Sequence, residues 1–221
     1  MPKTCFNCGR PATTKDHIPP KCLFRKNSKR QLISVPACKE CNESTALDDE
    51  YFCAALATML TASPAPQEVW NQRFRRQISR PDFQGLRKRL ASQIAPIWLP
   101  SPRGFALTGI LAAEQERMDR SIRKMVRGLF YHHRRRQMTT ETVIDVLWKP
   151  SDWLPDFAYQ CPLAVLEEDT FAYRYALTSD ELGVSMWWFA FYNSLLIVAL
   201  VAPPAFKEKA LRQGGDPAIS A

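Results

Sequence analysis

Apolar residues recur with a helical period through the middle of the chain. Between residues 106 and 136 they follow one another at three- and four-residue steps. This stripe consists of Leu107, Ile110, Leu111, Met118, Ile122, Met125, Val126, Leu129 and Phe130. The spacing is typical of an amphipathic helix and predicts one long helix over residues 106–136. Shorter helices are predicted at residues 67–76 and within residues 81–99, after a proline-rich linker at residues 61–66.

After residue 142 the pattern changes to that of β-strands, with alternating and β-branched residues. The predicted strands cover residues 143–148, 169–177, 185–192 and 195–201, with a turn at residues 180–183. Residues 184–201 are almost continuously apolar and are about as long as the shortest membrane span. Because Asn193 and Ser194 interrupt this run, a buried hairpin that turns there is favoured over a membrane span.

Two Cys-x-x-Cys pairs lie near the N-terminus, at Cys5 and Cys8 and at Cys38 and Cys41, with 29 residues between the pairs. Four thiolates in two such pairs are the ligands of a structural tetrahedral zinc ion, and this interpretation is favoured over free thiols. Seven cysteines in all, and no apolar run behind the N-terminus, indicate a reducing compartment and predict a cytoplasmic protein. The remaining cysteines are expected to be small apolar fillers.

The segment between the cysteine pairs carries polar residues of a different kind. A strand at residues 13–18 is predicted to present Asp16 and His17, and a basic loop leads to a returning strand at residues 31–36. The second cysteine pair opens a helix, and Asn42 follows it directly. Carboxylate and amide oxygens suit Mg²⁺ or Mn²⁺, and a neutral imidazole can take a proton from water.

These residue types are the ones that phosphodiester cleavage requires, since it needs a base and a cation for the developing charge. Asp48 and Asp49 are weaker candidates for an additional ligand. A simpler interpretation is that Asp16 caps a turn and His17 packs against the cysteine knuckle.

The motifs resemble those of the HNH endonuclease family, in its zinc-knuckle subgroup. The resemblance covers residues 5 to about 52 and rests on the two cysteine pairs, Asp16-His17-Ile18-x-Pro20, Leu32 and Asn42. It implies a ββα-metal (treble-clef-like) fold with a structural zinc. It also implies that His17 is the general base and that Asp16 and Asn42 hold a catalytic Mg²⁺ or Mn²⁺. Gln31 stands where the family has the asparagine that supports the base, and Thr45 stands where a basic residue is common.

Charge is distributed unevenly around a net value of +8. Residues 71–136 hold 16 basic and 4 acidic side chains, whereas residues 137–221 hold 5 and 11. The basic block predicts contacts with a phosphate backbone, of DNA with RNA not excluded. The candidate contact residues are Arg25, Lys26, Lys29, Arg30, Arg120, Lys124 and Arg127. The alternative is a solvated helix face, and His132-His133 are expected to lie at a helix-end surface rather than in a second site.

Together these patterns predict an α+β fold in three regions. Residues 1–60 form an HNH-type nuclease module with bound zinc, residues 67–136 a basic helical region, and residues 137–221 a β-rich region that packs on the helices. The predicted function is hydrolysis of DNA by a metal-dependent HNH endonuclease, with no membrane partner. One alternative is a zinc-ribbon protein that binds nucleic acid without cleaving it. Another is a structural zinc domain that tethers a protein-binding domain.

Overall fold

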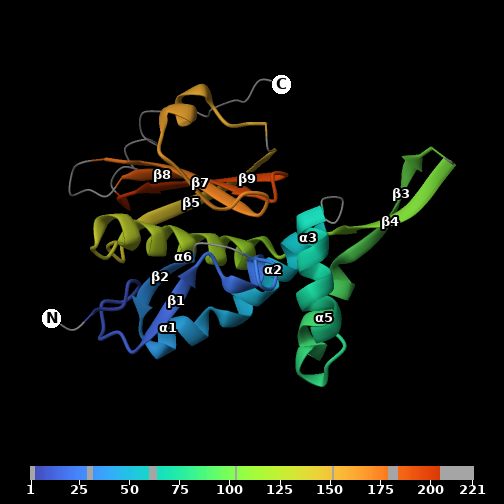
Figure 1. The fold of residues 1–221 in the computed structure, drawn as a ribbon, viewed down its shortest axis with the longest axis horizontal. Helices are drawn as coiled ribbons and strands as arrows, with labels where there is room; N and C mark the ends of the chain where they lie inside the picture. The colour runs from blue at the N-terminus through green and yellow to red at the C-terminus, as the bar shows by residue number, and fades with distance from the viewer. Residues whose placement is uncertain are drawn as a thin grey trace.

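A computed structural model describes the chain at residues 3–28, 32–59, 64–102, 104–150, 152–178 and 184–204. It is a mixed helix-and-sheet fold in which the long helix α6 (Gln115–Arg134) is the middle layer. Figure 1 shows a β-sheet on one side of α6 and the N-terminal elements on the other side. The predicted α+β class is therefore confirmed.

The N-terminal elements are a hairpin and two helices. Strands β1 (Thr14–Ile18) and β2 (Ile33–Ala37) pair antiparallel, and a 3-10 turn, η1 (Lys21–Leu23), follows β1. Helices α1 (Lys39–Ser44) and α2 (Ala46–Met59) come next. This strand, loop, strand and helix order is the one that the sequence predicts, although Lys29, Arg30 and Gln31 lie outside the described residues.

A helical run covers the helix predicted at residues 67–76 and begins earlier, at Pro64 inside the predicted linker. It comprises α3 (Pro64–Val69), the π-helical turn η2 (Trp70–Phe74) and α4 (Arg75–Gln77). Pro64 and Pro66 fall in the first turn of α3, where the missing proline N–H groups cost no helical hydrogen bond. The turn η3 (Pro81–Phe83) and helix α5 (Gln84–Gln93) follow.

The predicted helix over residues 106–136 is wrong in its first part. Strand β4 (Gly104–Leu111) pairs there with β3 (Ile94–Ser101), and the hairpin projects from the body of the molecule (Figure 1). The predicted helix within residues 81–99 accordingly ends at Gln93. Pro96 and Pro100 cannot join a helix interior, and Gly109 weakens one, so the helical spacing of the apolar residues in β4 is coincidental.

Helix α6 packs on both neighbouring layers. Its apolar stripe, from Met118 to Phe130, is buried, and the helix contacts α2, β1 and β2 on one side and β5 and β9 on the other. At Gly128 the helix backbone passes close to β1, because an added Cβ would lie 2.5 Å from Cγ1 of Ile18. The absence of a side chain at Gly128 is thus what allows the two elements to meet.

The described C-terminal strands form a five-stranded antiparallel sheet in the order β5-β9-β8-β7-β6. The strands are β5 (Val143–Pro150), β6 (Leu163–Glu167), β7 (Phe171–Leu177), β8 (Ser185–Phe191) and β9 (Leu195–Ala202), and a 3-10 turn, η4 (Asp156–Gln160), precedes β6. Strand β6 was not predicted, and the predicted turn at residues 180–183 lies outside the described residues.

The buried hairpin predicted around Asn193-Ser194 is confirmed by β8 and β9. Tyr192 and Asn193 both have a φ of 51°, as a type I′ turn requires, and the amide of Ser194 donates to the carbonyl of Phe191. Within the described ranges, no helix is long and apolar enough to cross a membrane.

One apolar core connects the N-terminal elements to the sheet. Buried residues run continuously from Phe6 through Phe52 and Ile122 to Trp187 and Ile197. Trp187 and Trp188 lie in the interior, whereas Trp153 is 43% exposed. Because α6 contributes to both sides of this core, it fixes the hairpin β1–β2 relative to the sheet.

Candidate functional site

The four paired cysteines converge as predicted. Their Sγ atoms all lie within 4.8 Å of one another, with 3.6 Å between Cys8 and Cys38. In a tetrahedral zinc–thiolate site, Zn–S bonds of about 2.3 Å separate the sulfurs by about 3.8 Å. The arrangement of Cys5, Cys8, Cys38 and Cys41 therefore fits a structural zinc ion.

Local backbone geometry forms this cluster. Gly9 has a φ of 75°, a conformation that glycine adopts readily, and its amide donates to the Cys5 carbonyl. The amide of Phe6 donates to the carbonyl of Pro36, which ties the first knuckle to β2. Cys38 caps α1 by accepting a hydrogen bond from the amide of Cys41 at 3.4 Å.

Two polar neighbours contact the thiols. Arg10 Nε lies 3.4 Å from Cys8 Sγ and its Nη2 lies 3.8 Å from Cys38 Sγ. The hydrogen bonds from Arg10 lower the pKa of Cys8 to about 6, which favours its thiolate. Burial instead raises the pKa of Cys41 to about 12, and Asn7 donates to this sulfur from 3.5 Å.

Asp16, His17 and Asn42 line one pocket of about 290 Å³. Asp16 and His17 come from the end of β1, and Asn42 comes from α1 directly after the second cysteine pair. Asp49 and Glu50 of α2 line the same pocket. The structure therefore brings together the three residues that the sequence singles out.

The wall opposite the strand was not predicted from sequence. Arg73 of η2, Phe74 and Gln77 line the pocket there. They belong to the helical run of residues 64–77; the sequence predicts a helix at residues 67–76 but not which surface this helix faces. The cluster of Arg73, Arg75 and Arg76 is the one local signal that a charged surface lies in this segment.

Lys124 of α6 reaches the buried side of this pocket. Its Nζ lies 2.8 Å from Asp16 Oδ2 and 2.5 Å from Asp49 Oδ2, and all three residues are buried. Burial lowers the pKa of Lys124, but the two carboxylates outweigh it and the net shift is upward, so the ammonium stays charged. Lys124 is thus a buried partner of two carboxylates, which leaves little of its side chain for the predicted contact with nucleic acid.

The hydrogen bonds of the Asp49 carboxylate are incomplete. Burial raises the pKa of Asp49 to about 6, an effect that Lys124 opposes and the neighbouring charge of Asp16 strengthens. Asp49 Oδ1 is buried and makes no hydrogen bond of ordinary geometry among the described residues, although the nearby Ser121 hydroxyl helps to lower the pKa of Asp49. A buried oxygen with an incomplete set of hydrogen bonds is a feature that a cation or a bound water would satisfy.

Cross-strand pairing orients His17. Its Nδ1 lies 3.1 Å from the hydroxyl oxygen of Ser34, the residue opposite it on β2, and its amide donates to Asp16 Oδ1 at 2.8 Å. Ser34 was missed from sequence because only the register of the hairpin reveals it. Asn42 Nδ2 donates to the hydroxyl of Thr14 at 3.4 Å.

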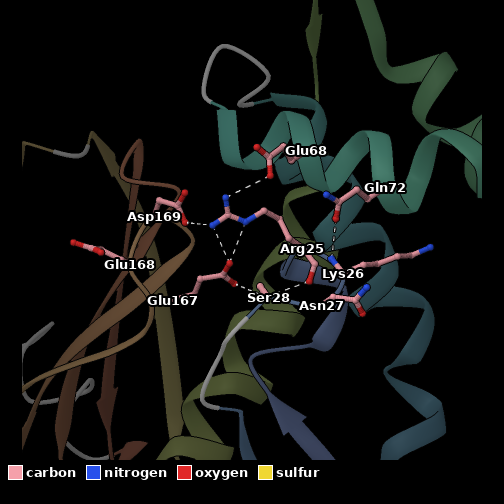
Figure 2. A pocket seen from close by; sticks show the side chains of 9 residues that line it. All are labelled: Arg25, Lys26, Asn27, Ser28, Glu68, Gln72, Glu167, Glu168 and Asp169. Carbon is pink, nitrogen blue, oxygen red and sulfur yellow. Dashed lines mark hydrogen bonds and ion pairs between the residues drawn. The ribbon is translucent and has the colours of Figure 1, made fainter.

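Several of the predicted phosphate contacts make ion pairs within the chain. Figure 2 shows Arg25 pointing between two elements, with Nη2 at 2.9 Å from Glu167 and 2.5 Å from Asp169. Arg120 pairs with Asp48 at 2.7 Å. Arg25 and Arg120 thus already pair with acidic residues of the chain, and a bound phosphate would have to share them with these residues.

Arg127 and Lys26 complete the described set. Arg127 Nη1 lies 3.4 Å from the carbonyl of Thr139, and burial lowers the pKa of Arg127. The Lys26 side chain is exposed and in Figure 2 is directed away from the ion pairs of Arg25. Lys26 therefore remains available for the predicted contact.

The histidine pair at the end of α6 is more enclosed than predicted. His133 stacks on Tyr175 with 4.1 Å between ring centroids, and its Nε2 lies 3.0 Å from the hydroxyl of Tyr173. Burial lowers the pKa of His133 to about 4, so the ring is neutral near pH 7. His133 is therefore a packing residue between α6 and the sheet.

Sequence and structure comparisons do not add a relative to this picture. Neither the protein-family models, nor the curated proteins, nor the solved structures contain a match to the chain.

Proposed function

We propose that the chain is a metal-dependent endonuclease of HNH type that hydrolyses DNA, with residues 5–52 as its ββα-metal module. The observation that carries this proposal is the single pocket that holds Asp16, His17 and Asn42 beside the cysteine cluster. Asn42 is 25 positions from His17 in the chain, and the pairing of β1 with β2 and the convergence of the four cysteines bring the two segments together. A base and two oxygen ligands in one pocket is the set that phosphodiester hydrolysis uses.

In this mechanism His17 takes the proton from the attacking water. When Nδ1 carries its hydrogen and donates it to Ser34, Nε2 has the lone pair that accepts this proton. Ser34 would thereby fix both the tautomer and the orientation of the ring. General bases of this kind contribute about 10²- to 10⁴-fold to a rate.

Asp16 and Asn42 would hold the divalent ion, with Asp49 as a third oxygen donor. The Oδ1 of Asp49, which lacks a hydrogen bond of ordinary geometry, and the hard donor set fit Mg²⁺ or Mn²⁺. Such an ion, when bound, stabilises negative charge on the phosphate and on the leaving oxygen. Lys124 neutralises one of the two buried carboxylates, so Asp16, Asp49 and Lys124 together carry one negative charge.

Nicking of supercoiled plasmid tests the proposal. We expect purified protein to nick DNA with Mg²⁺ or Mn²⁺, and His17→Ala to lower the rate at least about 100-fold with its zinc content unchanged. His132→Ala is the matched control, because His132 is half-buried on α6 and lines a different hollow. Equal nicking by the parent and by His17→Ala would contradict the role of His17.

The second candidate is a zinc-ribbon protein that binds DNA without cleaving it. The ion pair between Lys124 and Asp16 favours it, because the ammonium occupies an oxygen that a divalent ion would use. This candidate predicts DNA binding that weakens steeply with salt and no nicking in either metal. Absence of nicking by a zinc-loaded protein that still binds DNA would therefore select the second candidate over the nuclease.

A further inference from the structure

Positive charge is concentrated on one short stretch of the chain. Residues 71–93 hold seven basic side chains and one acidic side chain, a net charge of +6, whereas the whole chain carries +8. The stretch covers η2 from Asn71 on, α4, η3 and α5. Figure 1 shows α3 and α5 at the same end of the molecule, from which the hairpin β3–β4 projects. This end of the molecule is therefore strongly basic.

Most of these basic side chains are exposed and have no acidic partner. Five of them are exposed, form no ion pair among the described residues and make up the basic surface, namely Arg75, Arg76, Arg80, Arg87 and Lys88. On α6, by contrast, Arg117 and Arg120 both pair with Asp48. Arg123 of the same helix pairs with Glu116. The positive charge that is not neutralised within the chain thus lies on α4, on α5 and between them, rather than on α6.

One part of the basic surface is hollowed into a pocket. This basic pocket has a volume of about 510 Å³ and is lined by Asn71, Arg75, Arg76 and Ser79. Two guanidinium groups, an amide and a hydroxyl can all donate hydrogen bonds, and no acidic residue of the described chain lines the pocket. Guanidinium groups match the geometry of a phosphate, which accepts hydrogen bonds from several donors at once. The basic pocket therefore has the chemical composition of a phosphate site.

The same helical run also faces the pocket that holds His17. Arg73, Phe74 and Gln77 line that pocket. Arg76 follows Arg73 by three positions, so the two side chains are neighbours on the helix surface. A helix with its side chains is about 10–12 Å across, which corresponds to about three steps of about 3.4 Å along one strand of DNA. A strand with one phosphate beside His17 can therefore place a nearby phosphate in the basic pocket.

We propose that the basic surface binds the phosphate backbone of duplex DNA, with one phosphate in the basic pocket. This inference rests on the proposed function for DNA as the partner, but it does not require cleavage. Arginine and lysine contacts with phosphates position a duplex without reading its sequence. Single strands are bound largely by stacking on exposed aromatic rings, whereas in residues 71–93 Phe74 is buried and Phe83 is half-buried. The basic surface therefore suits a duplex better than a single strand.

The salt dependence of DNA binding by the full chain tests this inference. Each phosphate contact adds about 0.9 to the steepness with which log K falls against log salt. We expect the double variant Arg75→Gln, Arg76→Gln to reduce this slope by about 2 and to weaken binding to a short duplex at least about 10-fold at about 100 mM salt. The double variant Arg87→Gln, Lys88→Gln should have the same effect, because both side chains are exposed on α5.

Arg135→Gln, Arg136→Gln is the matched control, because it also removes two exposed, adjacent arginines, which directly follow α6. Its slope should stay within about 0.5 of the parent value. Slopes that remain at the parent value in both surface variants, or that fall equally in the control, would overturn the inference. Binding of the parent to vesicles of anionic lipid but not to DNA would show that the charge serves a membrane surface, and would also overturn it.

Nicking kinetics separate this inference from the proposed function. If the chain cleaves DNA, the surface variants should raise KM at least about 10-fold and change kcat less than about 2-fold, because their residues lie outside the pocket that holds His17. Cleavage by the parent with an unchanged KM in both variants would overturn the inference and leave the nuclease proposal intact. DNA binding without cleavage, with the slope reduced in both variants, would support the inference and contradict the nuclease proposal.

Discussion

Arg10 shows how one exposed side chain can tune the cysteine cluster. Its guanidinium contacts Cys8 and Cys38 and also pairs with Glu40. Positive charge beside thiols favours the deprotonated form that binds zinc. Groups that hydrogen-bond to metal ligands typically change metal affinity by about 10- to 100-fold when removed.

We therefore expect Arg10→Ala to lower zinc affinity about 10-fold, measured by competition with a chromophoric chelator at pH 7. Lys39→Ala, which removes an exposed positive charge from the start of α1, is the control and should leave the affinity nearly unchanged. If both variants lose affinity equally, the effect is one of general charge and not of the contact with Cys8.

Asp49 predicts an unusual pH dependence of stability. Its pKa rises from 3.8 to about 6 on folding because the carboxyl is buried. The folded state therefore holds this proton more tightly than the unfolded state. The resulting stabilisation is fully present below pH 3.8, is lost as the pH rises through about 6, and amounts to about 3 kcal/mol.

Asp49→Asn should remove this contribution. Between pH 4 and pH 7 the unfolding free energy of the parent should fall by about 2.4 kcal/mol relative to the variant, as measured by urea denaturation. Asp48→Asn is an opposite-sign control. Burial raises the pKa of Asp48, but its ion pairs with Arg120 and Arg117 outweigh this and lower it, so its stabilisation is lost as the pH falls. A difference between parent and Asp49→Asn that stays constant with pH would contradict the raised pKa.

At the residue scale, the sequence predicts local chemistry and misses long-range partners. Cys-x-x-Cys spacing and the adjacency of Asp16 to His17 are visible because they depend on a few neighbouring positions. Lys124 is 108 positions from Asp16, and its helical face alone does not show which carboxylates it meets. Ser34 becomes visible only once the register of β1 and β2 is known.

At the scale of the elements, predicted boundaries are wrong where the same residues fit both the period of a helix and the period of a strand. Leu107, Ile110 and Leu111 satisfy the three- and four-residue steps of a helix, yet they lie on β4. The proline pattern of β3 and the glycine at position 109 are the signals that identify a hairpin. The true helix begins at Gln115, where no proline or glycine interrupts the stripe until Gly128.

The close contact between α6 and β1 at Gly128 leads to a testable prediction. A methyl group there would lie 2.5 Å from Cγ1 of Ile18, so Gly128→Ala forces α6 and β1 apart. Overpacking of this kind costs about 1–3 kcal/mol and outweighs the gain in helix propensity. The expected result is a lower urea midpoint with an unchanged slope.

Gly85→Ala provides the control with the same chemical change. Gly85 also lies in a helix, α5, but nothing is within 4 Å of the position of an added Cβ. The Gly85→Ala substitution should therefore stabilise the protein by up to about 1 kcal/mol through its higher helix propensity. Stabilisation by Gly128→Ala as well would show that β1 moves away from α6 without cost.

At the scale of the whole molecule, the N-terminal elements and the sheet are joined by contacts that no local sequence pattern predicts. The hydroxyl of Tyr192, in the β8–β9 turn, donates to the carbonyl of Leu23 at 2.6 Å. Arg25, two residues later, reaches Glu167 at the end of β6. The three predicted regions follow composition, whereas the core runs through all of the layers around α6.

The Arg25 ion pairs show how contacts between the N-terminal elements and the sheet contribute to stability. The guanidinium contacts Glu167, Asp169 and, at 3.5 Å, Glu68 of α3, so three segments share one cation (Figure 2). The Glu167 side chain is 8% exposed, and Ser28 also donates to it. Removal of Arg25 leaves this carboxylate buried without its positive partner, which is the costly way to break a buried ion pair.

We expect Arg25→Met to lower the unfolding free energy by about 2 kcal/mol, less than for a fully buried pair because Arg25 itself is partly exposed. Glu167→Gln in the Arg25→Met background should recover much of this loss, since it removes the uncompensated charge. Urea denaturation of the parent, both single variants and the double variant gives the coupling energy directly. Simple additivity of the two changes would mean that Arg25 and Glu167 do not hold the segments together, and that the shared core around α6 does so alone.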